Sequence, residues 1–174
     1  MRSLMLVFLM AISALGAQDS AKATLLRISG GAGAGSFGLV AEGRILGGVE
    51  GSPWRFGVQV MGISELKLFT TPNENVSTLC FLVGKEMVPS GPLSFMLFGG
   101  GGFAASELRG KEIPSSGFIV DTYESKRSTD PALVVGVDLG VSFRRFVGAS
   151  LQLGLHASRV TTTYGALQLD VGSW

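Results

Sequence analysis

Large apolar side chains alternate with small or polar ones along most of the chain. In the segment 132–156, "ALVVGVDLGVSFRRFVGASLQLGLH", apolar residues occupy the odd positions on both sides of the Arg144-Arg145 pair. The even positions are mostly glycine, serine, aspartate, glutamine and histidine. Successive side chains of a β-strand point to opposite faces, so the pattern predicts two consecutive strands, each with one apolar face and one small or polar face.

The same alternation recurs in eight short runs, separated by Gly, Pro, Asn and Ser residues that favour turns. Most runs are close to or above the ~9–11 residues that a tilted membrane-spanning strand needs. The expected strands cover residues 24–34, 37–48, 55–69, 76–87, 92–106, 132–143, 147–158 and 161–173. The mature chain contains no run of 18 apolar residues, so a helical membrane span is not expected.

The segment 107–131, "ELRGKEIPSSGFIVDTYESKRSTDP", interrupts this series because it is charged and has no sustained periodicity. It is predicted to be one long loop, or a loop with a short strand pair at its tip. In a bacterial membrane barrel with both termini in the periplasm, the connections after strands one, three, five and seven are extracellular and the others are short turns. The segment 107–131 follows the fifth run and is therefore expected to be extracellular.

The turn between the sixth and seventh runs is constrained by the parity of the apolar positions. Residues that face each other across a hairpin share a face of the sheet, so this loop must contain an odd number of residues. A three-residue loop, Arg144–Phe146, would be flanked by Phe143 and Val147. A five-residue loop, "RRFVG", is the alternative, with Gly148 available for a left-handed conformation.

Alternation alone does not say which face is inside. In a membrane barrel the apolar face meets lipid and the polar face lines the lumen. Three features favour this arrangement: the polar face is rich in glycine and lightly charged, it mixes both signs of charge, and the apolar set extends through all eight runs. The side chains expected in the lumen are Arg27, Glu42, Arg44, Gln59, Glu65, Lys67, Glu86, Asp138, Arg144, Gln152, His156, Gln168 and Asp170.

Buried charges in such a barrel must be paired, because eight strands leave an interior that side chains alone can fill. The polar face therefore favours a filled, structural lumen over a gated polar pore. The expected charge network consists of Arg27, Arg44, Glu42, Asp138 and Asp170.

A soluble exported barrel or sandwich that binds a small apolar ligand is the other way to use the same alternation. In that arrangement the Val and Leu face would be internal. Asp138 and Gln152 would then be exposed to solvent.

The composition is unusually apolar for a soluble protein. The mean hydropathy is +0.41, and only 16% of the residues are charged, well below the usual quarter. The net charge of +1 gives no indication of nucleic-acid binding.

The first 16 residues are predicted to be a secretory signal peptide. Arg2 precedes a compact apolar stretch, 3–15, and small residues at Ala14 and Gly16 allow cleavage after Gly16, with cleavage after Ala17 as the alternative. No cysteine follows this stretch, so it is not a lipoprotein signal. Residues 17–174 are then the barrel domain.

Taken together, these features resemble the small bacterial outer-membrane β-barrels of the OmpX and OmpA-barrel type. The resemblance implies an all-β, eight-stranded antiparallel up-and-down transmembrane β-barrel in the bacterial outer membrane, with a structural or surface-interaction role. It implies membrane lipids, lipopolysaccharide and the outer-membrane assembly machinery as partners, and an extracellular partner for the 107–131 loop. Such chains end in an aromatic residue, here Trp174, and a bulge at Gly172-Ser173 would bring it into phase with Val171.

One constellation is similar to the outer-membrane lipid A deacylases, which are also eight-stranded barrels with a His-x-Ser motif. That resemblance implies His156 as the base, Ser158 as the nucleophile and Asp170 as the orienting acid of an acyl-transfer triad. The family has Asn after the serine and Glu as the acid, where this chain has Arg159 and Asp170. We therefore expect no catalysis, with a lipid A-modifying enzyme as the alternative.

The remaining motifs predict no cofactor and no metal. "GGAGAG" (30–35) and "FGGGGF" (98–103) are not followed by the Lys-Ser/Thr of a phosphate loop, and glycine within a strand more often marks close packing or a bend. Cys80 is the single cysteine and is expected to be a small buried side chain. No catalytic, cofactor-binding or metal-binding residue is assigned.

Overall fold

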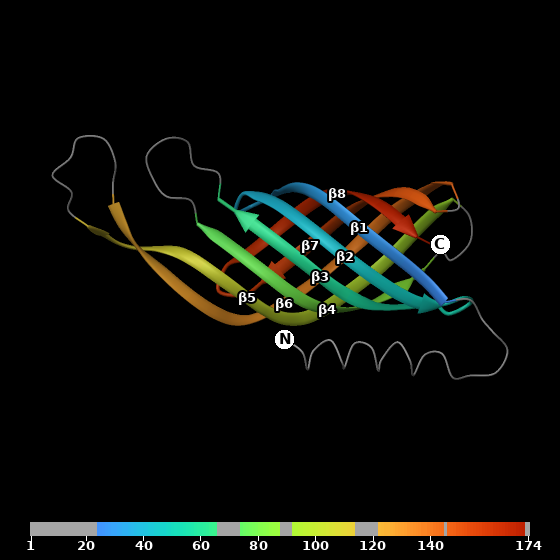
Figure 1. Ribbon diagram of the computed structural model, residues 1–174, viewed down its shortest axis with the longest axis horizontal. Helices are drawn as coiled ribbons and strands as arrows, with labels where there is room; N and C mark the ends of the chain where they lie inside the picture. The colour runs from blue at the N-terminus through green and yellow to red at the C-terminus, as the bar shows by residue number, and fades with distance from the viewer. Residues whose placement is uncertain (1–23, 66–73, 88–91, 114–121, 145, 173–174) are drawn as a thin grey trace.

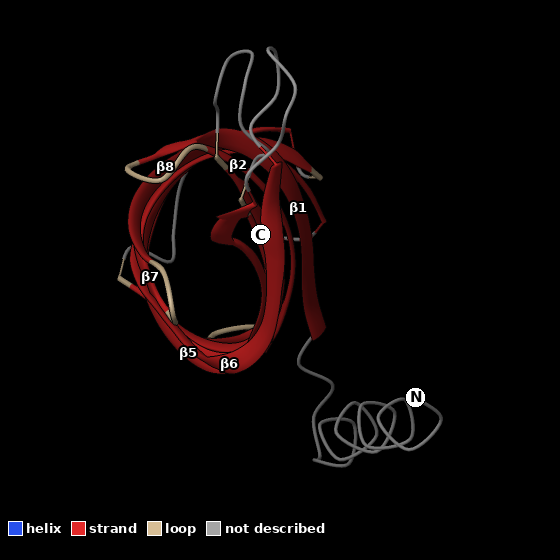
Figure 2. Cartoon of the chain, turned by 90° about the vertical axis from the view of Figure 1, so that its left-hand side faces the viewer, coloured by secondary structure: helices blue, strands red, loops and turns tan. Residues whose placement is uncertain are grey.

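A computed structural model of the chain describes residues 24–65, 74–87, 92–113, 122–144 and 146–172. Eight strands follow one another in the ring order of the sequence, and β1 pairs with β8 to close the barrel (Figures 1 and 2). All pairs are antiparallel, which confirms the predicted eight-stranded up-and-down β-barrel. The strands are β1 (Thr24–Gly35), β2 (Leu39–Val49), β3 (Trp54–Ser64), β4 (Asn75–Glu86), β5 (Leu93–Ile113), β6 (Thr122–Arg144), β7 (Val147–Ala157) and β8 (Thr161–Gly172).

The register places the apolar side chains outside, as the alternation predicts. Val137 faces Leu153 and Leu139 faces Leu151 across β6 and β7, and Leu139, Leu151 and Leu153 are exposed. Asp138 and Gln152, on the other face, are 1% and 0% exposed. The soluble alternative, which would expose these two polar residues and bury the apolar face, is therefore wrong.

The β6–β7 hairpin has the register of the predicted three-residue loop, with one change at its end. Val141 pairs with Ala149 and Ser142 with Gly148, and this register would place Phe143 opposite Val147. Instead the register shifts between Ser142 and Arg144, so that Arg144 pairs with Val147. The extra residue is a β-bulge, which lets the strand twist sharply into its tight turn.

The predicted long loop 107–131 is wrong at both of its ends. β5 continues to Ile113 and β6 begins at Thr122, so this hairpin is paired far beyond the rest of the barrel, and Figure 1 shows it projecting from one end. Glu107 pairs with Arg127 and Arg109 with Ser125 before a register shift near Glu112. The apolar alternation disappears here because both faces meet a polar environment, although backbone pairing continues on both sides of the register shift.

The connections divide between the two ends of the barrel as expected. β2, β4 and β6 end at one end of the barrel, here called the turn end, where β3, β5 and β7 begin. β1, β3, β5 and β7 end at the other, here called the hairpin end, from which β5 and β6 project. The expected strands at 55–69 and 161–173 are slightly longer than β3 and β8. The signal peptide, Lys67, Ser173 and Trp174 lie outside the described residues.

The glycine-rich motifs are strand interiors and not phosphate loops. Residues 98–103 belong to β5, and their glycines alternate between crowded and open positions. A Cβ atom added to Gly102 would lie 1.9 Å from the carbonyl oxygen of Leu79, whereas one added to Gly101 would be 3.5 Å from the nearest atom, on Leu133. Gly102 therefore allows β5 and β4 to approach closely inside the barrel, which confirms the close-packing interpretation.

Replacement of Gly102 by alanine is expected to weaken the barrel, because the new methyl group overlaps backbone that cannot move without breaking the β4–β5 ladder. Overpacking of this kind typically costs about 1–3 kcal/mol of unfolding free energy. The measurement is urea unfolding of the barrel refolded in detergent. Gly101→Ala is the matched control and should stay within about 0.5 kcal/mol of the parent; equal losses for the two variants would contradict the argument.

Candidate functional site

Five ionisable side chains meet inside the barrel and form what we call the luminal cluster. They come from β1, β2, β6 and β8, and none is more than 8% exposed. Its members are Arg27, Glu42, Arg44, Asp138 and Asp170. Arg27 Nη2 donates to Asp138 Oδ2 at 3.0 Å, and Arg44 Nη2 donates to the same oxygen. Asp170 accepts from Ser29 and lies 4.0 Å from Arg27 Nε, so four of the five form the predicted network of ion pairs.

A chain of amides joins Glu42 to the far wall of the barrel. Gln59 Nε2 donates to Glu42 Oε2 at 2.6 Å, and Gln168 Nε2 donates to Glu42 Oε1. Gln168 also donates to Gln152 Oε1 at 2.6 Å, and Gln152 Nε2 donates to the Tyr164 hydroxyl at 2.6 Å. Hydrogen bonds therefore cross the interior between β2, β3, β7 and β8, as buried polar groups require.

Most of the side chains predicted for the lumen are buried there. Glu65 and Glu86 are half-buried near the barrel ends, and Arg144 is exposed at the β6–β7 turn, so the prediction is wrong for Arg144. The bulge before Arg144 changes the phase of the strand and explains this exception. The buried members are Arg27, Glu42, Arg44, Gln59, Asp138, Gln152, His156, Gln168 and Asp170.

The interior also holds an apolar group that the sequence analysis missed. Toward the hairpin end the inward-facing residues are Val40, Met61, Ile63, Val76, Ala132 and Val134, with Phe37 and Val160 packed against them. Toward the turn end they are Leu46, Leu82, Met96 and Phe98. One strand of the sequence could have indicated these buried apolar residues. In β4, apolar side chains occupy both faces of the strand, as in Leu82 and Val83. The luminal cluster therefore shares the interior with apolar side chains: Leu46 pairs with Arg27 and Met96 with Asp138 across neighbouring strands.

The triad implied by His156, Ser158 and Asp170 is not assembled. His156 is fully buried, and its Nε2 lies 3.1 Å from Thr78 Oγ1. The Ser158 hydroxyl donates to the carbonyl of Val160 at 3.3 Å. On β7, His156 is eight positions from Gly148, the partner of Asp170, which separates base and acid by roughly 25 Å along the strand. These residues cannot act as a triad.

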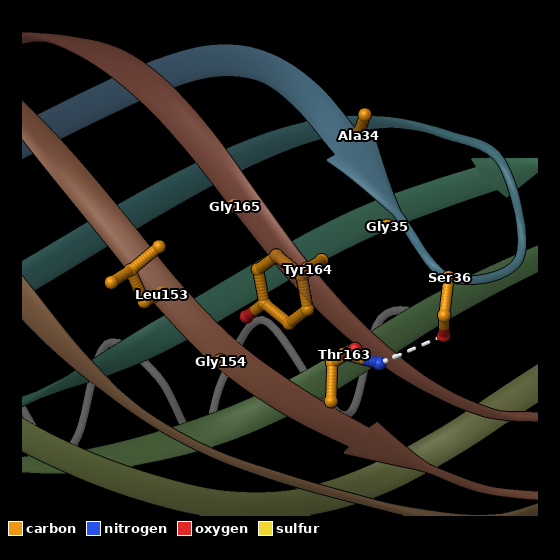
Figure 3. Close-up of a pocket in the computed structure, with 8 residues that line it drawn as sticks. All are labelled: Ala34, Gly35, Ser36, Leu153, Gly154, Thr163, Tyr164 and Gly165. Carbon is orange, nitrogen blue, oxygen red and sulfur yellow. Dashed lines mark hydrogen bonds between the residues drawn. The ribbon is translucent and has the colours of Figure 1, made fainter.

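A shallow groove on the barrel wall, where the end of β1 meets β7 and β8, has no catalytic group either (Figure 3). Its lining consists of Ala34, Gly35, Ser36, Leu153, Gly154, Thr163, Tyr164 and Gly165. The Ser36 hydroxyl accepts from the backbone N–H of Thr163 at 3.2 Å. No histidine, carboxylate or lysine is among these lining residues, so the serine has no base to activate it.

The outer surface of the barrel is apolar on all eight strands. Leu167 on β8 is 71% exposed and Phe103 on β5 is 65% exposed. Exposed Trp54, Phe143 and Phe146 lie near the turn end, where the Lys85 ammonium sits 5.8 Å from the Trp54 ring. A continuous apolar band of this extent is far larger than the apolar patches of water-soluble monomers.

The β5–β6 hairpin is tied to the rest of the barrel at its base. Arg109 Nη2 donates to Glu65 Oε2 at 2.6 Å, and the backbone N–H of Arg109 donates to Glu74 Oε1 at 2.9 Å. Glu65 and Glu74 flank the β3–β4 connection. A single arginine therefore joins the projecting hairpin to its neighbouring loop.

At the edge of the ring, where Glu107 pairs with Asn75 of β4, the Glu107 carboxylate accepts hydrogen bonds from Ser125 at 2.6 Å and from Arg127 Nη2 at 3.1 Å. These contacts lower the pKa of the Glu107 carboxyl. Because the pKa is lowered, the cross-strand contact stabilises the folded hairpin at pH values above the ordinary glutamate pKa. This stabilisation is lost as the pH falls through the lowered pKa. The Arg127 side chain is 80% exposed and that of Glu107 43% exposed, so the contact is a minor support for the hairpin.

Metal and helical features are absent from the described part of the chain. No group of three His, Cys, Asp or Glu side chains there is arranged to hold a metal ion. Within the same ranges, no helix is long and apolar enough to cross a membrane. Cys80 is buried, as predicted.

Neither a family model nor a curated protein sequence matches the chain. Solved structures nevertheless share its fold. A major outer membrane protein from Thermus thermophilus superposes with a TM-score of 0.67 at 10% identity, over 86% of this chain and 99% of that one. The N-terminal β-barrel domain of Pseudomonas aeruginosa OprF gives 0.53 at 11% identity, over 88% and 99%. Ail, the attachment invasion locus protein of Yersinia pestis, gives 0.50 at 10% identity, over 88% and 99%. The chain therefore has the fold of small outer-membrane β-barrel proteins.

Proposed function

We propose that the chain is an integral outer-membrane barrel that presents the β5–β6 hairpin outside the cell as a surface-interaction element and performs no catalysis. The observation that carries this proposal is the apolar exterior. Large apolar side chains are exposed on every strand of a ring that has no free edge. Such a surface is unfavourable in water and favourable in the hydrocarbon core of a bilayer.

The orientation follows from the export route and the topology. Residues 1–16 direct the chain through the inner membrane, and both ends of the barrel domain then stay in the periplasm. An even number of strands places the turn end in the periplasm and the hairpin end outside. Short turns on the periplasmic side and longer elements outside are typical of bacterial barrels. The exposed aromatic residues near the turn end would lie at the periplasmic membrane interface, where aromatic side chains are enriched.

The interior supports a structural lumen and not a pore. Arg44 and Asp138 are almost fully buried and bonded to each other in the middle of the barrel. Apolar side chains such as Met61 and Leu82 are buried in the same interior. A permeating ion would have to displace a buried ion pair and pass closely packed apolar side chains, and both steps are costly.

The hairpin supports an interaction role because it is ordered before any partner binds. Its strands are paired over residues that project beyond the ring, and Arg109 fixes its base to Glu65 and Glu74. A preorganised element loses little conformational entropy on binding. Outer-leaflet lipid, including lipopolysaccharide, would surround the wall below it, and an extracellular partner would meet the hairpin itself. The assembly machinery would act on the chain during insertion.

Cell fractionation tests the membrane assignment. The protein is expected in the outer-membrane fraction, and its electrophoretic mobility should differ between unheated and boiled samples, because a closed barrel resists detergent until it is heated. A band in the soluble periplasm with no change on boiling would overturn the proposal. Loss of residues 1–16 from the mature protein, measured by mass spectrometry, checks the export signal.

Conductance in planar bilayers tests the closed lumen. The purified barrel should produce no stable channel openings, because the luminal cluster and the buried apolar side chains obstruct the interior. An empty-detergent sample is the baseline, and a known general porin is the positive control. Regular, reproducible openings that scale with the amount of this protein would show a pore.

Substitution of Arg109 by alanine tests the support of the hairpin. Losing these partly buried ion pairs should cost about 1 kcal/mol of local stability. Cleavage of the hairpin by a non-specific protease should then be about fivefold faster, because proteolysis follows the population of the open form. Lys111→Ala, on the same strand and exposed, is the control. The barrel of both variants should keep its mobility change on boiling, and equal cleavage of the two hairpins would contradict the role of Arg109.

A further inference from the structure

The luminal cluster contains one more acid than base. Within the part of the chain that the structure describes, its cations are Arg27 and Arg44 and its anions are Glu42, Asp138 and Asp170. With every group ionised, the cluster would carry one uncompensated negative charge. Such a charge inside a barrel is strongly unfavourable unless a positive charge joins it.

Glu42 is the one acid of the luminal cluster that forms no ion pair with Arg27 or Arg44. Asp138 is paired with both Arg27 and Arg44, and Asp170 lies 4.0 Å from Arg27. Neither arginine comes within ion-pair distance of Glu42, whose oxygens contact the amides of Gln59 and Gln168. The unbalanced charge therefore falls on Glu42.

The other ionisable groups around the cluster do not supply the missing cation. On β8 and β7, the neighbours of Glu42 are the neutral side chains of Tyr164, Gln168 and Gln152. At the turn end, Arg55 of β3 is paired with Glu86 of β4, so this pair adds no net charge. The buried His156 is four residues from Gln152 along β7, roughly 13 Å away, and contacts Thr78 on β4.

The surroundings of Glu42 contain an acceptor for a proton. The Gln59 Oε1 atom is buried and has no hydrogen-bond partner, although Gln59 Nε2 is only 2.6 Å from Glu42 Oε2. A half-turn of the Gln59 amide exchanges its oxygen and nitrogen, so that a protonated Glu42 would donate to the Gln59 carbonyl.

We infer that Glu42 is a proton-binding site: in the folded barrel at neutral pH it holds one proton, which makes the luminal cluster electrically neutral. The proton comes from water during folding and is retained on Glu42 Oε2, where it bonds to Gln59 Oε1. Loss of this proton at high pH would restore the uncompensated negative charge, so raising the pH should destabilise the folded barrel.

Infrared spectroscopy of the mature barrel, folded in detergent at neutral pH, tests the site directly. The parent protein should show the C=O stretching band of a protonated carboxyl group, which shifts in deuterated water. Glu42→Gln should lose this band completely. Glu107→Gln, which changes a partly exposed carboxyl outside the luminal cluster, should keep it. Absence of the band in the parent, or its persistence in folded Glu42→Gln, would overturn the inference.

The pH dependence of the parent barrel provides a second test that does not depend on the variant folding. Raising the pH should remove the infrared band and, over the same interval, lower the temperature at which the unheated mobility is lost. Folded Glu42→Gln, which is neutral at every pH, should lack this decrease. A parent barrel whose thermal transition does not change while the band disappears would contradict the link between the proton and stability. These measurements use the isolated barrel, so their failure is distinct from failure of the membrane assignment.

Discussion

The pairing of β1 with β8 is the constraint on which the rest of the structure depends. Nine residue pairs, from Arg27–Gly172 to Gly35–Tyr164, join the first strand to the last. Without them the sheet would have two open edges, and the unpaired backbone groups of those edges would be costly in lipid and prone to association in water. With them, each strand has a neighbour on both sides within the ring. Closure also creates an inside, and so determines that one face of every strand is enclosed.

The interior is chemically mixed because eight strands enclose little space. Every inward side chain contacts several others, so an arginine there must find a carboxylate and a glutamine must find an amide or an acid. Arg44 satisfies this requirement through Asp138 and Gln168, and the ring of Phe98 lies 5.5 Å from its guanidinium carbon. Crowded glycines such as Gly33, where a Cβ atom would lie 1.8 Å from the Gly165 carbonyl oxygen, allow neighbouring strands to approach. Polar bonding and close backbone packing together hold the barrel in one register.

The lengths of β5 and β6 show where the alternation of apolar and polar residues no longer predicts a strand. Within the ring, one environment is apolar and the other enclosed, and alternation follows. Beyond the ring, both faces of the hairpin meet a polar environment, so residues 107–113 and 122–131 show no alternation although their backbones are paired. The contacts of Arg109 with Glu65 and Glu74 join segments about 35 to 44 positions apart, and no local pattern indicates them. The prediction also missed the apolar side chains inside the barrel. It assumed that the inward face of every strand is polar throughout, whereas this face carries both polar and apolar residues.

The sequence by itself determined the number of strands, their order, the face that each turns outward and most of the buried polar set. These follow from a period of two and from turn residues, which are local properties of the chain. Only the tertiary structure decided which acid meets which arginine, that Glu42 meets none, that His156 and Asp170 lie far apart, and that Val40 and Met61 share the interior with the charges. Those outcomes depend on the register between strands, which sets the height of every side chain in the barrel. Register results from all eight pairings closing at once, and no single segment contains that information.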